Sequence, residues 1–402
     1  MNTEAGLYLG KLLSCLNLSF FSEAWANYLK FLPILIIGIL SSLILTPIIG
    51  YIANKYDITY KPGVKRQGRD FDNQEKAIHE GITPSLGGLA ITIPTLLAIV
   101  FFFKMDSTTI PILISILILI IGSTLDDIFN LPAKAQLLYQ LVAAIIIAFS
   151  IINLTNLSII NISLDAFTWN FKLLGIQNSF VFPGDLIMIF WIIVCINAYK
   201  WTAGSPGIIE GNSIIIFLLI FIISTRFNIL FSSTLSILIT GGMIIFFIFA
   251  LPPQKIMTGS AGKSIYGFLI CVLSILADAK LTTSLILLII PLLDFIFVII
   301  KRYITHRPKS ISELMKINGP DHFHHQLIKI GLTRTQVVLA EISITLLFGS
   351  IAILTAGAVR YFVVVLVIAL ATGVIVYANI RALKKEQKKE INKESPESRF
   401  SY

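Results

Sequence analysis

Long apolar runs separated by short polar segments dominate the pattern along the chain. About eleven such runs occur, each near the roughly 20 residues with which an α-helix crosses the hydrocarbon core of a bilayer. They lie at 31–53, 86–103, 108–124, 135–153, 183–199, 211–225, 228–250, 262–277, 281–300, 336–355 and 361–380. The pattern predicts an all-α fold, a polytopic membrane helix bundle with about 10–11 transmembrane helices.

The composition agrees with a membrane protein. Hydrophobic residues make up 56% of the chain and charged residues 13%, about half of the roughly 25% found in soluble domains. The three cysteines show no pair spacing, so no disulfide framework or cysteine metal site is expected. We divide the chain into a short N-terminal segment at 1–30, a transmembrane domain at 31–380 and a charged tail at 381–402.

The positive charges predict the orientation. If the runs cross in alternation, 24 of the 31 Lys and Arg residues fall on one side of the membrane and 7 on the other. Cytoplasmic loops carry the excess of Lys and Arg, so we expect the N-terminus outside and the C-terminus in the cytoplasm, in a plasma (inner) membrane. The net charge of +9 requires no nucleic-acid partner, because anionic lipid and an anionic substrate account for it.

Five loops on the predicted cytoplasmic side carry the chemically suggestive residues. The first, ITPSLGGL at 82–89, contains Gly87 and Gly88. Paired glycines allow backbone to approach a ligand or a neighbouring helix closely. Both interpretations stay open from this motif alone.

Adjacent carboxylates mark the second loop. Asp126 and Asp127 stand at the end of an apolar run, where acids are costly unless a cation binds them or water reaches them. Mg²⁺ binds proteins through one or two carboxylates together with substrate phosphates, so the pair is a candidate metal site. Lys134, seven residues on, could contact the same phosphates.

The third and fourth loops combine glycine, proline and lysine. Asn197 and Lys200 lie one helical turn apart at the start of NAYKWTAGSPGIIEGN, and irregular backbone at membrane depth is tolerated where it lines a polar cavity or is buried in protein. In PPQKIMTGSAGKS at 252–264, Lys255 and Lys263 flank a turn that could offer backbone N–H groups to a phosphate.

The fifth loop contains most of the histidines. Four of the five lie between 306 and 325, and His322, His324 and His325 fall within four positions. Without a cysteine nearby, a structural zinc site is a weak explanation. Hydrogen bonding to an anionic or sugar-bearing ligand fits better.

Taken together, the loops resemble those of the polyprenyl-phosphate N-acetylhexosamine-1-phosphate transferases. The resemblance rests on GSTLDD…K…Q at 122–140, NAYK at 197–200, PPQKIMTG at 252–259 and HFHHQLIKIGLT at 322–333, with support from 46–63 and TPSLGGLAI. It covers about residues 35–380. The His-x-His-His sequence is closest to the undecaprenyl-phosphate GlcNAc-1-phosphate branch.

This resemblance implies an enzyme, a phosphoglycosyltransferase, that moves HexNAc-1-phosphate from a UDP-amino sugar to a polyprenyl phosphate lipid, with Mg²⁺ or Mn²⁺ as cofactor. By similarity, Asp126, Asp127, Lys134 and Asn197 are catalytic, and the two aspartates hold the metal. Gly87, Gly88, Lys200, Lys255, His322, His324 and His325 are expected to bind substrate. A homodimer is compatible with the family, although no motif in the sequence indicates one.

The chain departs from the family pattern at several charged positions. Lys200 stands in place of a family asparagine, and Ala203, Pro206 and Ser260 stand in place of family acids. The presumed site is therefore more positive than in the family, which puts the metal dependence in question.

Three functions remain open from the sequence. The chain could be an active transferase with a rebuilt site, to which Glu210 returns a carboxylate. It could instead bind polyprenyl phosphate or a nucleotide sugar without turnover. A transporter would need ionisable residues that face each other inside the bilayer. Asp294 is the clearest acid deep in an apolar run, and its own segment supplies no partner.

Overall fold

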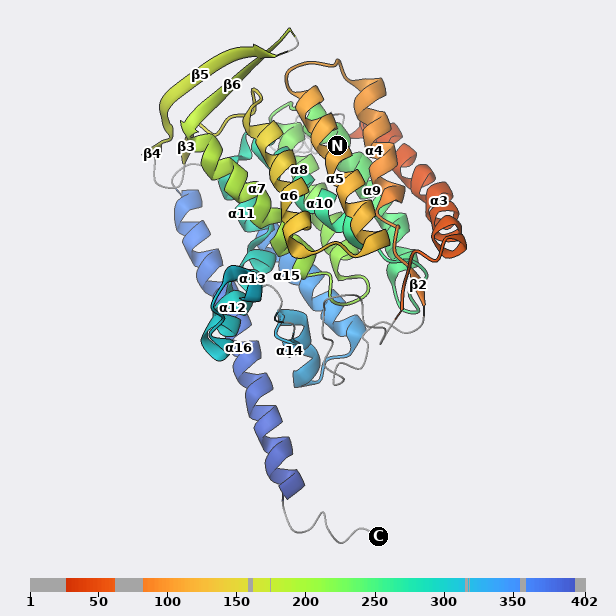
Figure 1. Ribbon diagram of the computed structural model, residues 1–402, viewed down its shortest axis with the longest axis vertical. Coiled ribbons are helices and arrows are strands. Elements are labelled where there is room, and N and C mark those ends of the chain that lie inside the picture. Colours follow the sequence, from red (N-terminus) through yellow and green to blue (C-terminus); the bar gives the residue numbers. More distant parts are fainter. Residues whose placement is uncertain are drawn as a thin grey trace, which may run out of the picture.

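The computed structural model describes residues 27–61, 82–157, 162–173, 175–314, 317, 319–354 and 359–394 (Figure 1). Most of the predicted N-terminal segment and the last eight residues lie outside these ranges. The helices are α3 Leu32–Lys55, α4 Leu89–Phe102, α5 Thr109–Phe129, α6 Ala133–Ala148, α7 Gly184–Trp201, α8 Ile208–Arg226, α9 Leu230–Ala250, α10 Gly259–Ser274, the π-helix η1 Ile275–Ala279, α11 Lys280–Leu287, α12 Ile289–His306, α13 Ile311–Leu314, α14 Phe323–Ile330, α15 Arg334–Leu354 and α16 Val359–Glu394. The strands are β1 Thr59–Tyr60, β2 Thr83–Pro84, β3 Asn156–Leu157, β4 Ile162–Ser163, β5 Asp165–Leu173 and β6 Ile176–Pro183.

The fold is a polytopic membrane helix bundle. Among the described residues, eight helices are long and apolar enough to cross a bilayer, or up to nine if the bent pair α11–α12 forms one span. The apolar helices α4 and α6 are shorter, at 14 and 16 residues. These elements match the predicted runs one for one. A count of ten or eleven spans requires α4 and α6 to cross as well, and it stays a prediction.

Helices α8 and α10 form the centre of the bundle and α3 lies at its edge. In α8 and α10, 78% of the most apolar window is buried, against 22% in α3. Large apolar side chains such as Leu43, Phe101 and Phe190 cover the outside of the bundle. In a bilayer this surface faces lipid, which is why it needs no polar cover.

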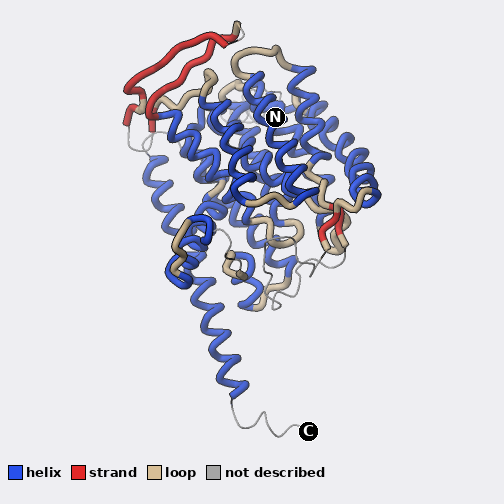
Figure 2. Tube along the Cα trace, viewed as in Figure 1, coloured by secondary structure: helices blue, strands red, loops and turns tan. Residues whose placement is uncertain are grey.

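A β-hairpin, β5–β6, departs from the all-α prediction. The two strands pair antiparallel and project from one end of the bundle (Figure 2). Phe167, Trp169 and Phe171 alternate with polar residues along β5, which is the period of a strand. The stretch lies between the predicted runs at 135–153 and 183–199, and it is too polar to span a membrane.

Two helices also differ from their predicted spans. The run predicted at 281–300 is broken at Leu288, where α11 and α12 meet at 76°. Pro291 explains the break, because its ring excludes the helical carbonyl four residues earlier. The last helix, α16, continues far beyond the predicted end at 380 into the charged segment, as far as Glu394.

Polar segments gather at the end of the bundle opposite the hairpin. The short helices α13 and α14 lie there, beside the part of α16 that projects beyond the bundle (Figure 1). The C-terminal end of α5 and the N-terminal end of α10 meet at the same end, because Asp127 bonds the first turn of α10. This is the end that the charge pattern predicts to be cytoplasmic.

Candidate active site

A polar cavity of about 270 Å³ lies where the helix ends converge. Its described lining consists of Asp126, Ala133, Gln136, Leu137, Asn197, Lys200, Trp201, Ser260, Lys263, Arg302 and His322. These residues come from α5, α6, α7, α10, α12 and the residue that precedes α14. The second to fifth loops identified in the sequence therefore meet at one cavity.

The first loop packs against the fourth loop, next to the cavity. The N–H groups of Gly87 and Gly88 donate to the carbonyl oxygens of Met257 (2.9 Å) and Thr258 (2.8 Å). A Cβ on Gly88 would clash with the backbone of Gly262. Neither glycine lines the cavity, and close packing against the fourth loop accounts for both of them. Their role in substrate binding stays a prediction.

Asp126 and Lys200 are joined through one side chain, Gln136. The Gln136 amide nitrogen donates to Oδ1 of Asp126 (2.8 Å) and to the carbonyl oxygen of Leu131 (3.0 Å). The Gln136 amide oxygen accepts a bond from Nζ of Lys200 at 2.9 Å. Since the amide nitrogen is held by two acceptors, its oxygen is fixed toward Lys200. The acid and the cation are thereby positioned on the same wall.

A second glutamine of α6 holds Asn197. Gln140 lies one helical turn after Gln136, so both project from one face of the helix. Its Oε1 accepts a bond from Nδ2 of Asn197 at 2.7 Å, and the same nitrogen donates to the carbonyl oxygen of Ile193. These two bonds to the amide nitrogen fix the orientation of Asn197. Its amide oxygen is then the atom that can accept a hydrogen bond from a ligand.

Asp127 points away from Asp126, toward the first turn of α10. Its Oδ1 accepts the N–H of Ser260 at 2.8 Å, and its Oδ2 accepts the N–H of Ala261 at 3.2 Å. A carboxylate in this position satisfies N–H groups that have no partner within the helix and faces the positive end of the helix dipole. The described residues place Asp127 on a different hollow from Asp126, of about 240 Å³.

His322 pairs with Asp294, a contact between residues far apart in sequence. Nδ1 of His322 lies 2.8 Å from Oδ2 of Asp294, whose other oxygen accepts the N–H of Phe323 at 2.7 Å. The segment around Asp294 was expected to supply no partner, and the partner indeed comes from elsewhere, from the histidine loop. Trp201 stands edge-on to the His322 ring, with centroids 5.5 Å apart.

The two other histidines lie behind His322. His324 is buried, and its ring occupies the space that a Cβ on Gly204 would need. Within the described part of the chain, Nε2 of His324 and Nδ1 of His325 have no hydrogen-bond partner. Burial, together with the neighbouring histidines, lowers the pKa of His324 well below its usual value; burial, together with His322 and Lys329, lowers the pKa of His325 to about 4. Both rings are therefore neutral at physiological pH.

Two predicted lysines lie away from the cavity. Lys134 is exposed at the start of α6 and is not among the lining residues. Lys255 is exposed as well, with Nζ 5.8 Å from the centre of the Phe249 ring. Neither lysine is among the described residues that line the cavity, so their contact with substrate stays a prediction.

Positive charge predominates in the cavity lining. The described lining contains Lys200, Lys263 and Arg302 but one carboxylate, Asp126; outside the lining, Asp321 lies 3.6 Å from Arg302 and 2.6 Å from Lys301. Unit charges about 4 Å apart interact by about 4 kcal/mol at an effective dielectric constant near 20. A cavity with this lining attracts an anion and disfavours an additional cation.

Glu210 does not supply the cavity with another acid. Its carboxylate accepts a hydrogen bond from the Thr258 hydroxyl, and it is 2% exposed. It is not among the cavity-lining residues. Among the described residues, no group of three or more His, Cys, Asp or Glu side chains could hold a metal ion. With Asp126 as the one carboxylate of the described lining, beside Lys200, Lys263 and Arg302, the residues present fit a divalent metal held by the protein alone poorly.

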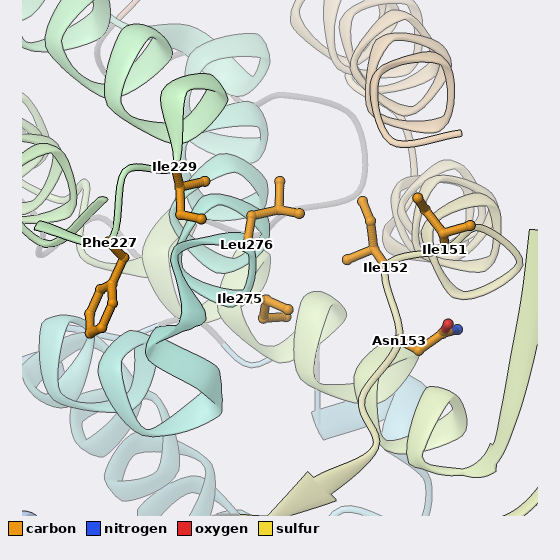
Figure 3. Close-up of a pocket in the computed structure, with 7 residues that line it drawn as sticks. All are labelled: Ile151, Ile152, Asn153, Phe227, Ile229, Ile275 and Leu276. Carbon is orange, nitrogen blue, oxygen red and sulfur yellow. The ribbon is translucent and has the colours of Figure 1, made fainter. Parts of the chain in front are cut away.

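A larger hollow at the opposite end of α6 and α10 has a different character. It measures about 420 Å³, and its described lining is Ile151, Ile152, Asn153, Phe227, Ile229, Ile275 and Leu276 (Figure 3). None of these side chains is ionisable. The smaller cavity at Asp126 is therefore the better candidate for chemistry on charged substrates.

Sequence reasoning missed the site residues that lie inside helices. Gln136, Gln140 and Arg302 belong to helices, α6 and α12, whereas the predicted site residues come from loops and helix ends. The glutamines carried a usable signal, since polar residues at i and i+4 in an otherwise apolar helix share one face. Arg302 follows Asp294 by about two turns, which likewise puts them on nearby faces of α12.

Comparison with known proteins agrees with the chemistry of this cavity. Residues 109–278 match glycosyl transferase family 4. A probable undecaprenyl-phosphate N-acetylglucosaminyl 1-phosphate transferase of Bacillus subtilis is 27% identical over 367 residues, which cover 89% of this chain and 94% of the relative. A phospho-N-acetylmuramoyl-pentapeptide-transferase of Halalkalibacterium halodurans is 25% identical over 67% of this chain and 82% of its own length.

The stretch that matches the family includes Asp126, Asn197, Lys200 and Lys263 of the cavity. The chain is therefore similar, over most of its length, to an undecaprenyl-phosphate sugar-1-phosphate transferase, and its residues 109–278 match glycosyl transferase family 4.

Proposed function

We propose that the protein transfers GlcNAc-1-phosphate, or a closely related HexNAc-1-phosphate, from a UDP-sugar to undecaprenyl or another polyprenyl phosphate. UMP is released, and the lipid-linked sugar starts the synthesis of a cell-envelope polysaccharide. The observation that carries this proposal is the cavity in which Asp126 and Lys200, joined through Gln136, face Lys263 and Arg302. The relatives' names supply the substrates.

The chemistry suits this lining. An oxygen of the lipid phosphate forms a bond to the sugar-side phosphorus of the UDP-sugar, while the bond from that phosphorus to the bridging oxygen breaks. UMP leaves with the electron pair. A phosphate monoester with a second pKa near 6 is largely ionised at neutral pH, so a strong general base is not required. Alignment and neutralisation of the two anions supply the catalysis.

We assign roles to side chains according to their place in the cavity. Lys200, Lys263 and Arg302 contact the diphosphate, and Asn197 and His322 orient the nucleotide sugar. Asp126 holds Lys200 through Gln136 and faces the lipid phosphate. A divalent metal is the family expectation, with Asp126 as its nearest carboxylate; the poor fit described above limits that expectation, and no step here depends on it.

The orientation belongs to the proposal too. The excess of Lys and Arg around the cavity end of the bundle supports a cytoplasmic active site in the plasma membrane, with the N-terminus outside. UDP-sugars are cytoplasmic metabolites, so the substrate is available on that side. The apolar surface of the bundle gives the prenyl chain a lateral route from the lipid phase.

Lys200, Ala203 and Ser260 differ from the family pattern, and these differences favour one alternative. In that alternative the protein binds either substrate without turnover. The experiment that separates the two uses purified protein with UDP-GlcNAc and undecaprenyl phosphate, with lipid product as the readout. Asp126→Asn serves as the variant expected to lose product. Binding of UDP-GlcNAc without any lipid product would favour the alternative.

A further inference from the structure

The cavity contains fixed cations where a metal-dependent transferase needs carboxylates. Lys200, Lys263 and Arg302 line it together with Ser260, and Asp126 is the one acid among the described lining residues. The acids around it are already engaged: Asp127 with the first turn of α10, and Asp321 with Lys301 at 2.6 Å and Arg302 at 3.6 Å. The remaining surface is suited to an anion.

Each of the three cations is held in place by the fold. Gln136 directs Lys200, because its amide nitrogen is bound by Asp126 and by the carbonyl oxygen of Leu131. Arg302 lies over the Trp201 ring, with its guanidinium carbon 5.4 Å from the ring centre. Lys263 projects from the first turns of α10, whose N-terminal N–H groups are anchored by Asp127. Cations that are positioned before substrate binds need no reorganisation when charge develops.

We propose that Lys200, Lys263 and Arg302 neutralise the diphosphate of the nucleotide sugar by fixed charge, so that this chain binds its substrate and transfers the sugar phosphate without a resident divalent metal. The inference rests on the proposed function for its substrate. It explains why the replacement of family acids at 203 and 260 coincides with a lysine at 200 in the same chain. Gln136 is the positioning residue of this arrangement.

Substrate binding gives the first test. UDP-GlcNAc is titrated calorimetrically into the full-length protein in nanodiscs, once with chelator and once with Mg²⁺. We expect the two Kd values to agree within about twofold, and Lys200→Asn to weaken binding by about tenfold or more. Lys200→Arg, which keeps the charge, should retain most of the affinity. Lys172→Asn on the exposed hairpin is the matched control and should leave Kd unchanged.

Restoring the family charges gives the second test. In Lys200→Asn combined with Ser260→Asp, one cation is removed and one carboxylate is added at the first turn of α10, where an acid is favourable for the helix. We expect Mn²⁺ titration followed by electron paramagnetic resonance to show one bound ion in this double variant and none in the wild type. Product formation by the double variant should become sensitive to chelator. Thermal melting and gel filtration report whether each variant is folded.

The outcomes separate this inference from the proposed function. Lipid product that survives chelator in the wild type supports both. Lipid product that is lost with chelator and returns with Mg²⁺, together with stoichiometric Mn²⁺ binding by the wild type, overturns the inference and leaves the function standing. Chelator-insensitive UDP-GlcNAc binding without lipid product under any condition overturns the function and leaves the cationic binding site standing.

Discussion

His322 and Asp294 are separated by 28 residues and lie 2.8 Å apart, with Nδ1 of the imidazole against Oδ2 of the carboxylate. Asp294 belongs to α12 and His322 immediately precedes α14, so the contact ties the histidine loop to a membrane helix. The acceptor also fixes which ring nitrogen carries a proton. Nε2, on the far side of the ring, is then the nitrogen available to a ligand.

Asp294→Asn should reduce transfer with little loss of folded protein. The amide would present an N–H to Nδ1 of His322 and favour the other tautomer, while its oxygen still accepts from Phe323. A hydrogen bond to a charged group contributes about 1.5–3 kcal/mol, so kcat/KM should fall by about 10- to 100-fold. Steady-state kinetics and the pH profile test this. An unchanged profile would show that the pair acts only in folding.

Gln136→Leu should raise the KM for the UDP-sugar more than it lowers kcat. Leucine has a similar volume but cannot bridge Asp126 and Lys200, so the lysine loses its fixed direction. We expect KM to rise by about tenfold, the effect of roughly 1.4 kcal/mol. Gln177→Leu, on the exposed face of the hairpin, is the matched control. Equal effects of both substitutions would exclude a positioning role for Gln136.

The sequence predicted the segmentation of this fold well because hydropathy determines it. Each of the eleven apolar runs corresponds to a helix or to the bent pair, since backbone in lipid must satisfy its own hydrogen bonds. The break at Leu288 and the β5–β6 hairpin were not predicted. Both depend on local features, Pro291 and a period-2 alternation of apolar and polar residues. Hydropathy averaged over the roughly 20 residues of a membrane span does not detect such features.

The site was predictable in its loops but not in its pairings. Asp126, Asn197, Lys200 and His322 line one cavity, as residues from loops on the same side would. The bridges from Gln136 and Gln140 could not be anticipated, because they depend on how α6 is rotated against α5 and α7. Asp126 and Asp127 look equivalent in sequence. In the helix they diverge, since successive residues point about 100° apart.

Gly259→Ala should destabilise the junction between the first loop and α10. Gly259 has φ +70°, and a Cβ there would clash with the carbonyl oxygen of Ser85. We expect a loss of about 2 kcal/mol or more, seen as a lower Tm of the detergent-solubilised protein. Gly175→Ala is the control, because Gly175 has φ +80° with open space around it. The Tm of the Gly175→Ala protein should fall by less than the Tm of the Gly259→Ala protein. An equal fall would show that the clash with Ser85 is not the cause of the destabilisation.

Acidification should destabilise the histidine loop. The pKa of His325 is lowered to about 4 by burial and by His322 and Lys329, from a usual value of 6.5. Between these values the unfolded chain binds more protons than the folded one, so the free energy of unfolding falls as pH drops from about 6.5 to 4. The stabilisation is complete above that window. At about pH 5 we expect a loss on the order of 1–2 kcal/mol.

Thermal melting across this window measures the effect. The wild type should lose Tm as pH falls, and His325→Gln should lose less because one of the two titrating rings is gone. His306→Gln provides the control, because His306 is exposed at the end of α12. The same pH dependence in the wild type and His325→Gln would contradict the assignment to His325.

The most direct measurement is the formation of lipid-linked sugar by purified protein given UDP-GlcNAc and undecaprenyl phosphate. We predict a polyprenyl-diphospho-sugar and an equal amount of UMP from the wild type, and loss of both in Asp126→Asn, which remains folded. Substrate binding with neither product at any metal concentration would contradict the assignment of this cavity as a transferase active site.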